Sequence, residues 1–399
     1  MISVGIDVSK GKSTICILKP YGEIVSKPFE INHVEKDMAE LATMLLRFDD
    51  EVKVVMEATG IYHLPVATYL QEKGLFTSII NPFEMKEYRC QGLRRVKTDK
   101  QDAITISNYG IDHWFRLKNY EATAQVYEEL KLLGRQYRHY MRMRIESVQE
   151  LTHLLDYTMP GIKTLLKGWN ETNGKDKLSD FVEEYWHFDN ITKKSEKQFL
   201  NSYIKWAEKK GYHQSQDKAQ KIYSLAQESI PTLSSNTPSV KMLVQEAVRV
   251  LREVDTTLMK ILTQMQSLSK TLPEYLVVRA MGGVGDVLAP KLIAEIGDVR
   301  RFHNGKALIA YTGIDAPPYQ SGQFVGTERK ISKRGSSALR KIGYEVMRCL
   351  KTHAAPEDDA VYQFILKKER EGKCKRSAKI AGLNKFLRIY YARVMEIYQ

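Results

Sequence analysis

The order of short apolar segments in the first eighty residues restricts the fold more than any other feature of the chain. Three segments with the composition of β-strands come first, joined by short turns that contain glycine. A segment with helical spacing, a strand, a helix and another strand follow. The seven segments are residues 2–9, 13–19, 23–31, 38–48, 52–60, 64–74 and 75–82. The short turns predict that the first three strands form an antiparallel meander.

This order of elements is that of the RNase H-like (RuvC-like) α/β fold, although other α/β domains begin in the same way. Asp7 lies in the middle of the first predicted strand, with apolar residues on both sides. Valine or isoleucine would pack better there, because burying an uncompensated carboxylate is costly. The position therefore predicts a role for Asp7 that requires its charge.

Three further acids are placed to meet Asp7. Glu57 lies near the end of the fourth predicted strand, which is the neighbour of the first strand in an RNase H-like sheet. Asp99 and Asp102 are three residues apart, a spacing that puts both on one face of a helix. If that helix packs on the sheet, four carboxylates converge.

Four clustered carboxylates repel one another, and divalent cations compensate such a cluster. Hard oxygen ligands select Mg²⁺ or Mn²⁺, and two such ions can stabilise both oxygens of a phosphoryl transfer. Taken singly, Asp99 and Asp102 are typical of solvated or capping residues, and Glu57 of a strand end. Together, Asp7, Glu57, Asp99 and Asp102 predict a catalytic metal site.

Cations lie next to this acidic set in the sequence. A basic run leads directly into Asp99, and it comprises Arg89, Arg94, Arg95 and Lys97. Basic side chains beside a carboxylate metal site are what a phosphodiester backbone requires. We therefore expect these four residues to bind nucleic acid.

The middle of the chain has helical periodicity. Apolar residues step by three or four from Leu130 to Leu155, and a heptad seam runs from Ala247 to Leu268. The two seams predict an antiparallel coiled-coil arm, formed within one chain or between chains, with an ordinary helical bundle as the alternative. The polar, Lys-rich stretch between them, 161–238, is predicted to form helices with loops. We expect three domains, at residues 1–115, 116–270 and 271–399.

The C-terminal region, predicted to be mainly α-helical, is strongly basic. The whole chain carries a formal net charge of +13, and from Ser321 onward 18 Lys and Arg stand against 8 Asp and Glu. This excess indicates a nucleic-acid partner. The cations expected to bind it are Arg329, Lys333, Arg334 and Arg340.

Ser321 lies in the Pro/Gly turn PPYQSGQF, just before these cations. Guanidinium groups around a serine can lower the hydroxyl's pKa and neutralise a pentavalent phosphorus transition state. Serine in such a turn is usually turn chemistry alone, and Ser332, Ser336 and Ser337 are equally near the cations. The sequence leaves open which serine reacts.

The segment GGVGD precedes a predicted helix and resembles a helix-hairpin-helix turn. Amides at Gly283 and Gly285 could hold a DNA phosphate, whereas a simple tight turn is the ordinary interpretation.

Cysteine usage and hydropathy point to the cytoplasm. The four cysteines are scattered and form no CxxC pair, which argues against a zinc site and fits a reducing compartment. No apolar stretch approaches the length of a membrane span. We expect no membrane partner.

Several of these short motifs occur together, in one order, in a known family. GIDVSK, MEATG, the KTDKQDA element, the GGVGD turn, the SG turn with ISKRG, and the basic C-terminal segment resemble the DEDD transposases of the IS-one-ten insertion-sequence family. The resemblance covers residues 1–155 and 238–399. The segment from about residue 161 to 238 looks like an enlarged version of the family's middle region, and its role stays open.

The resemblance implies a RuvC-like domain, a coiled-coil arm and a C-terminal transposase domain. It implies that Asp7, Glu57, Asp99 and Asp102 are the four acids and that Ser321 is the nucleophile. It also implies recombination of donor and target DNA guided by a structured bridge RNA, in dimers that pair into tetramers. The rival interpretations are a junction-resolving endonuclease that uses the acids alone and a non-catalytic nucleic-acid-binding protein. A sugar-kinase relative is disfavoured because no second nucleotide-binding half is present.

Overall fold

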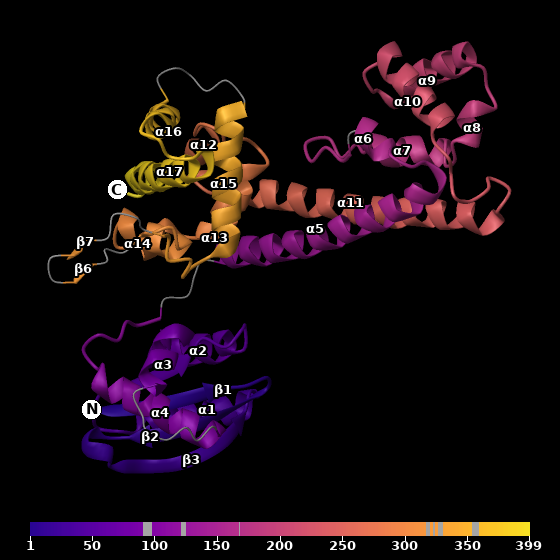
Figure 1. The fold of residues 1–399 in the computed structure, drawn as a ribbon. Coiled ribbons are helices and arrows are strands. Elements are labelled where there is room, and N and C mark those ends of the chain that lie inside the picture. Colours follow the sequence, from indigo (N-terminus) through magenta and orange to yellow (C-terminus); the bar gives the residue numbers. More distant parts are fainter. Residues whose placement is uncertain are drawn as a thin grey trace. The chain divides into compact units, whose positions relative to one another are not determined.

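The computed structural model describes residues 1–90, 98–120, 125–166, 168–316, 320–321, 324–325, 330–352 and 359–399 (Figure 1). The chain forms two compact units, Met1–Ala122 and Thr123–Gln399. The finer division at residues 115 and 270 stays a prediction. None of the described helices combines the length and the apolar character needed to cross a bilayer.

The N-terminal unit is built on a five-stranded mixed sheet in the order β3-β2-β1-β4-β5. β1 pairs antiparallel with β2, and β2 with β3, whereas β4 is parallel to both β1 and β5. This meander followed by parallel strands is the RNase H-like arrangement, so the predicted fold is confirmed. The strands are β1 (Ile2–Val8), β2 (Lys12–Leu18), β3 (Ile24–Asn32), β4 (Val52–Glu57) and β5 (Phe76–Ile80).

The two faces of the sheet carry different helices. Because side chains alternate along a strand, Ile2, Val4, Ile6 and Val8 of β1 share one face and pack with α1 (Glu35–Leu46) and α2 (His63–Glu72). Ser3, Gly5 and Asp7 therefore point to the other face, which α4 (Asp99–Asp112) covers. The short elements η1 (Pro20–Gly22) and α3 (Pro82–Arg89) complete the unit.

Small residues let α4 lie directly on β1. A Cβ atom added to Gly5 would stand 2.3 Å from both the Ala103 carbonyl oxygen and the Ser107 nitrogen. Added to Gly110, it would collide with Ser3. The Ser107 hydroxyl donates a buried hydrogen bond of 2.8 Å to the Ser3 carbonyl oxygen. These contacts fix where the first turn of α4 begins.

Two long helices, both predicted, form the spine of the second unit: α5 (Gln125–Thr158) and α11 (Pro238–Lys270). The start of α5 shares a core with the end of α11, and the end of α5 shares another core with the start of α11, so the pair is antiparallel. Figure 1 shows the pair running from the C-terminal helices to the inserted helices. A coiled-coil contact between chains stays a prediction.

The segment between these helices folds into a small helical subdomain, as predicted, with an aromatic core around Phe181, Phe199 and Tyr203. Its helices are α6 (Ile162–Leu165), α7 (Lys177–Glu184), α8 (Asp189–Thr192), α9 (Glu196–Lys210) and α10 (Gln216–Glu228).

The C-terminal region is mainly helical. Its core also contains residues from the start of α5 and the end of α11. One small hairpin interrupts the helices that the structure describes there. The elements are α12 (Tyr275–Arg279), α13 (Leu288–Ile296), η2 (Val299–Arg301), α14 (Gly305–Thr312), β6 (Gln320–Ser321), β7 (Phe324–Val325), α15 (Ser337–Thr352), α16 (Ala360–Arg370) and α17 (Lys375–Ile397).

Candidate active site

The four predicted acids come from three elements on the α4 side of the sheet. Asp7 is near the end of β1, and Glu57 is the last residue of β4. The residues before them, Ile6 and Met56, pair with each other, so the two acids lie on neighbouring strands at the same level. Asp99 and Asp102 lie in the first turn of α4, where carboxylates interact favourably with the helix dipole. The Thr98 side chain caps this helix by accepting a hydrogen bond from the Gln101 amide.

The electrostatics show that these acids influence one another. The pKa of Asp7 is raised to about 6, first by burial and then by the negative charges of Asp102, Asp99 and Glu57, with Arg89 opposing the rise. A carboxylate with this pKa stands among like charges with too few cations nearby. An added cation would relieve that excess.

Arg89 joins two of the acids. Its Nη2 donates a 2.8 Å hydrogen bond to Glu57 Oε2, and its Nε lies 3.4 Å from Asp102 Oδ1. The sequence suggested only a nucleic-acid contact for this residue. The structure shows it as an internal counterion, which the strand and helix patterns could not reveal.

Aromatic packing places Arg89 at the acids. The preceding residue, Tyr88, packs edge-on against Tyr109 of α4, with ring centroids 5.2 Å apart. The Tyr88 hydroxyl donates to Asp112 and the Tyr109 hydroxyl to Glu84, so α3 is fastened to α4 from both sides. Burial and these acceptors raise the pKa of both tyrosines, which keeps the hydroxyls as donors.

The donor set suits a hard divalent cation. All four groups are carboxylates, the ligands that Mg²⁺ and Mn²⁺ prefer, and their repulsion is expressed in the raised pKa of Asp7. Among the residues that the structure describes, no three His, Cys, Asp or Glu side chains are yet spaced to hold a metal. In this arrangement Arg89 is hydrogen-bonded to Glu57 and lies beside Asp102. A metal ion that binds these two carboxylates would have to displace the arginine.

The predicted serine lies on a β-hairpin. Ser321 of β6 pairs with Phe324 of β7, and Gln320 with Val325. The base of this hairpin is fastened: the Ser332 amide donates to the Asp315 carbonyl oxygen, and the Lys333 amide to that of Gly313. Arg329, like Arg94, Arg95 and Lys97, lies outside the described residues.

The other predicted cations of this region differ in their exposure and in the hydrogen bonds that the structure gives them. Lys333 is exposed and has a positive φ of 54°, which turns the chain sharply at the hairpin base. Arg334 is also exposed. Arg340 instead donates from Nη1 to the carbonyl oxygens of Thr312 and Gly335, so it caps the end of α14. A nucleic-acid contact of Arg340 stays a prediction.

The two predicted glycines of the turn before α13 have different surroundings. A Cβ on Gly283 would meet the Val346 carbonyl oxygen at 2.5 Å, so this glycine allows close packing on α15. Gly285 has a φ of 140°, is exposed and has open space where a Cβ would stand. Only Gly285 is therefore free to approach a phosphate, and that role stays a prediction.

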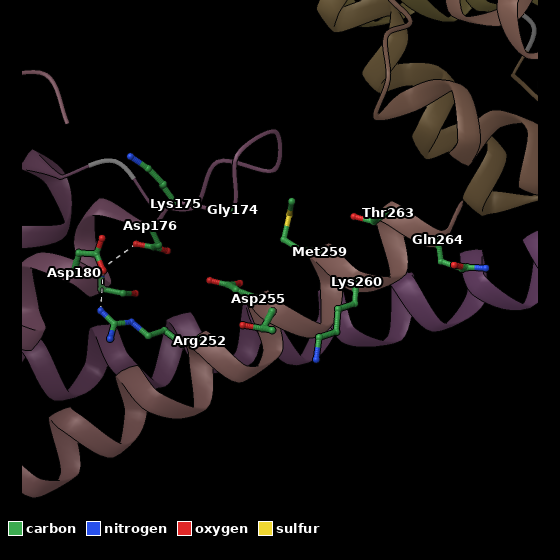
Figure 2. Close-up of a pocket in the computed structure, with 12 residues that line it drawn as sticks. Gly174, Lys175, Asp176, Asp180, Arg252, Asp255, Met259, Lys260, Thr263 and Gln264 are labelled. Carbon is green, nitrogen blue, oxygen red and sulfur yellow. Dashed lines mark hydrogen bonds and ion pairs between the residues drawn. The ribbon is translucent and has the colours of Figure 1, made fainter. Parts of the chain in front are cut away.

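A pocket of about 650 Å³ lies between the start of α7 and α11 (Figure 2). Its acids are already paired: Asp180 accepts from Arg252 at 2.7 Å, while Asp176 and Asp255 both accept from Arg144. Sequence reasoning missed this ionic joint, because its members are up to 111 residues apart. It holds the inserted subdomain on the spine and contains none of the predicted site residues.

Two family models match the chain. The model of the DEDD transposases of the IS110 type matches residues 4–160, and that of the transposase IS116/IS110/IS902 family matches residues 276–363. The first match contains the acids, and the second contains the hairpin. The chain belongs to the IS110 transposase family. This transposase is therefore an enzyme that acts on DNA.

Curated relatives and solved structures are similar to the chain to different extents. The transposase is 24% identical to the pilin gene-inverting proteins of Moraxella bovis and Moraxella lacunata, over 86% of this chain and 80% of each relative. It also resembles Thermus thermophilus RuvC, solved alone and in complex with a Holliday junction substrate. These likenesses have 13% and 12% identity and TM-scores of 0.25 and 0.24, and they cover 30% of this chain and 100% and 99% of RuvC.

Proposed function

We propose that this transposase cuts and rejoins double-stranded DNA by attack of Ser321 on a phosphodiester, with Mg²⁺ or Mn²⁺ held by Asp7, Glu57, Asp99 and Asp102. The observation that carries the proposal is the acidic cluster itself. Asp7 of β1 feels the charges of Glu57 of β4 and of Asp99 and Asp102 of α4, two of which contact Arg89, and its pKa is raised to about 6. Their surplus negative charge is what a divalent ion at a phosphate compensates.

In the proposed step, a bond forms between Ser321 Oγ and phosphorus as one P–O ester bond to the neighbouring sugar breaks. The serine loses its proton and the leaving sugar oxygen gains one. The phosphoserine link keeps the ester, so a hydroxyl of another strand can reverse the step without ATP. Bound at the acids, the ions would polarise the phosphate and stabilise the charge that develops on it.

The surroundings of the other serines support Ser321. The Ser332 hydroxyl is bonded to Asp315, and the Ser336 hydroxyl donates to Glu295 while accepting from the Leu339 amide. Both therefore have structural partners. Lys333 and Arg334, which follow the hairpin and are exposed, are proposed to stabilise the phosphorane charge or to hold RNA backbone.

We further propose that a structured bridge RNA directs the transposase to donor and target DNA, and that dimers pair into tetramers. In that assembly the acids of one subunit act with the hairpin serine of another. The two gene-inverting relatives support recombination of DNA segments as the activity.

The test is strand exchange in a reconstituted reaction with the element's DNA ends and the non-coding transcript that flanks the gene. Ser321→Ala is expected to abolish exchange and the covalent DNA adduct detected by mass spectrometry. Asp7→Asn is expected to lower exchange by about a thousandfold. Omitting the transcript is expected to abolish it.

The matched controls are Ser337→Ala and Asp49→Asn, which change exposed residues of the same chemistry and should leave exchange intact. Junction cleavage that persists in Ser321→Ala and needs only the acids would instead establish a metal-dependent endonuclease. Exchange that survives Asp7→Asn would show that the acids are not catalytic.

A further inference from the structure

A stripe of cations runs along the exposed face of α5 near its start. Lys131, Arg135, Arg138 and Arg142 follow one another at intervals of four, three and four residues, so they share one helix face. The adjoining side of the helix is buried in the core through Leu130, Gly134 and Tyr137. The stripe spans twelve residues, about 16 Å at the rise of an α-helix.

Arg301 of η2 adds a fifth cation from a separate element. Its guanidinium donates to the Ile296 carbonyl oxygen and lies 4.5 Å from the Tyr311 ring centroid. Partial desolvation and the positive charges of Arg301 and Arg135 lower the pKa of Lys131. These cations are therefore close enough to repel one another.

The cluster has few carboxylates near it. Within the described ranges of the chain, Arg138 pairs with Glu295, whereas Lys131, Arg135, Arg142 and Arg301 form no ion pair. Glu128 acts on Lys131, and Asp298 on Arg301, only at longer range. Lys131, Arg135, Arg142 and Arg301 are exposed. Cations that keep a surplus of positive charge on rigid elements are suited to binding a polyanion backbone.

Glu295 ties this cluster to the base of the serine hairpin. One of its oxygens accepts from Arg138, and the other accepts a 3.1 Å hydrogen bond from the Ser336 hydroxyl. The Ser336 amide donates to the Tyr311 carbonyl oxygen, and Tyr311 carries the stacked Arg301. The cluster and the chain that closes the hairpin thus form one fixed assembly.

We infer that Lys131, Arg135, Arg142 and Arg301 bind the phosphodiester backbone of the DNA duplex that Ser321 attacks, an inference that rests on the proposed function. The stripe matches the rise of about five nucleotides of one strand. The ligand is DNA, because the cluster is fixed to the segment that carries the attacking serine. Arg138 is the positioning residue that joins it to Glu295.

The test compares two triple variants of the full-length protein. Lys131→Ala/Arg135→Ala/Arg142→Ala removes three cations of the stripe. Lys197→Ala/Lys205→Ala/Lys209→Ala removes three exposed lysines of α9 and matches the charge change. Binding of a fluorescent duplex is measured by anisotropy over a range of salt concentrations, and thermal melts verify that both variants are folded.

The stripe variant is expected to weaken duplex binding about tenfold or more and to reduce the slope of log K against log salt by about 2.7. The α9 variant should leave the slope close to that of the native protein. A stripe variant with an unchanged slope, or with a loss confined to a structured RNA hairpin, overturns the inference.

Ser321→Ala separates this inference from the proposed function. That variant should retain duplex binding and the native salt slope while losing strand exchange. Exchange that survives Ser321→Ala contradicts the proposed function, whereas the salt slope of the stripe variant still decides whether the cations contact DNA.

Discussion

Two arginines of this protein each join two carboxylates, yet their surroundings differ. Arg144 is bonded through Nε to Asp255 at 2.6 Å and through Nη2 to Asp176 at 2.7 Å, and it lies over the Trp169 ring. Its side chain is 11% exposed, and both acids are 8% exposed. Arg89 is 33% exposed, Glu57 and Asp102 are 17% exposed, and its buried Nε has no hydrogen-bond partner.

The charge balance differs as well. Arg144 contacts two acids, whereas Arg89 contacts two acids and also acts on Asp7, which in turn feels the charge of Asp99. The Arg144 joint is the more buried of the two, and the arginine is hydrogen-bonded to both acids, so it holds two parts of the fold together. The Arg89 site is more exposed, and more carboxylates lie near it, so we expect its arginine to be displaced by a stronger cation. Burial and charge balance thus distinguish a structural ion network from a candidate catalytic one.

The largest stability effect is expected at the structural joint. Arg144→Ala leaves two buried carboxylates without their counterion and should lower the free energy of unfolding by about 3–5 kcal/mol. Urea unfolding measures this loss. Arg249→Ala, which removes an exposed arginine from α11, should change stability by less than about 0.5 kcal/mol. Similar values for the two variants would contradict the structural role.

The acidic site depends instead on the close approach of α4 to β1. Gly5→Ala places a Cβ 2.3 Å from backbone atoms of α4, so it should lower the stability by about 3 kcal/mol and abolish Mn²⁺ binding. Gly305→Ala is the control, because its Cβ would meet only ordinary contacts at 3.7 Å. Calorimetry of unfolding and of Mn²⁺ binding measures both effects. Native Mn²⁺ affinity in Gly5→Ala would show that the helix position is unimportant.

A pH dependence follows from Asp7. Its folded-state pKa of about 6 lies above the ordinary value of 3.8, so the folded state binds more protons between these values. Without divalent cations, stability from this group is therefore lost as the pH rises from about 4 to 6. The native protein and Asp7→Asn should be equally stable near pH 4, and Asp7→Asn more stable by about 2 kcal/mol at pH 7.

Thermal unfolding in EDTA across this range measures the difference. A gap that stays constant with pH would show that Asp7 titrates normally. Saturating Mg²⁺ should stabilise the native protein more than Asp7→Asn.

The smallest expected effect is on metal affinity at Arg89. Because Arg89 competes for Glu57 and Asp102, Arg89→Ala should tighten Mn²⁺ binding by about tenfold, the equivalent of about 1.4 kcal/mol. Arg47→Ala removes an exposed arginine from the same unit and should change the affinity much less. Isothermal titration calorimetry compares the three proteins. Weaker binding in Arg89→Ala would show that the guanidinium supports the metal site rather than competing for it.

The acids could be predicted because their signals are local. Asp7 interrupts an apolar strand, and the alternation of β1 places it on the face that α4 covers. The pair Asp99 and Asp102 follows helical spacing. The pairing of Arg89 and the inward turn of Arg340 have no such signal, because their partners lie elsewhere in the sequence.

By itself, the sequence determined the order of strands and helices in the N-terminal unit and the two long helices, and it pointed to four acids that the structure brings within electrostatic reach of one another. Periodicity and side-chain chemistry act over a few residues, so they can be read along the chain. Only the tertiary structure decided which arginine is buried between its acids and which is more exposed, and which cations gather with few acids beside them. Burial and charge balance depend on residues more than a hundred positions apart, as between Arg144 and Asp255, so no local pattern contains them.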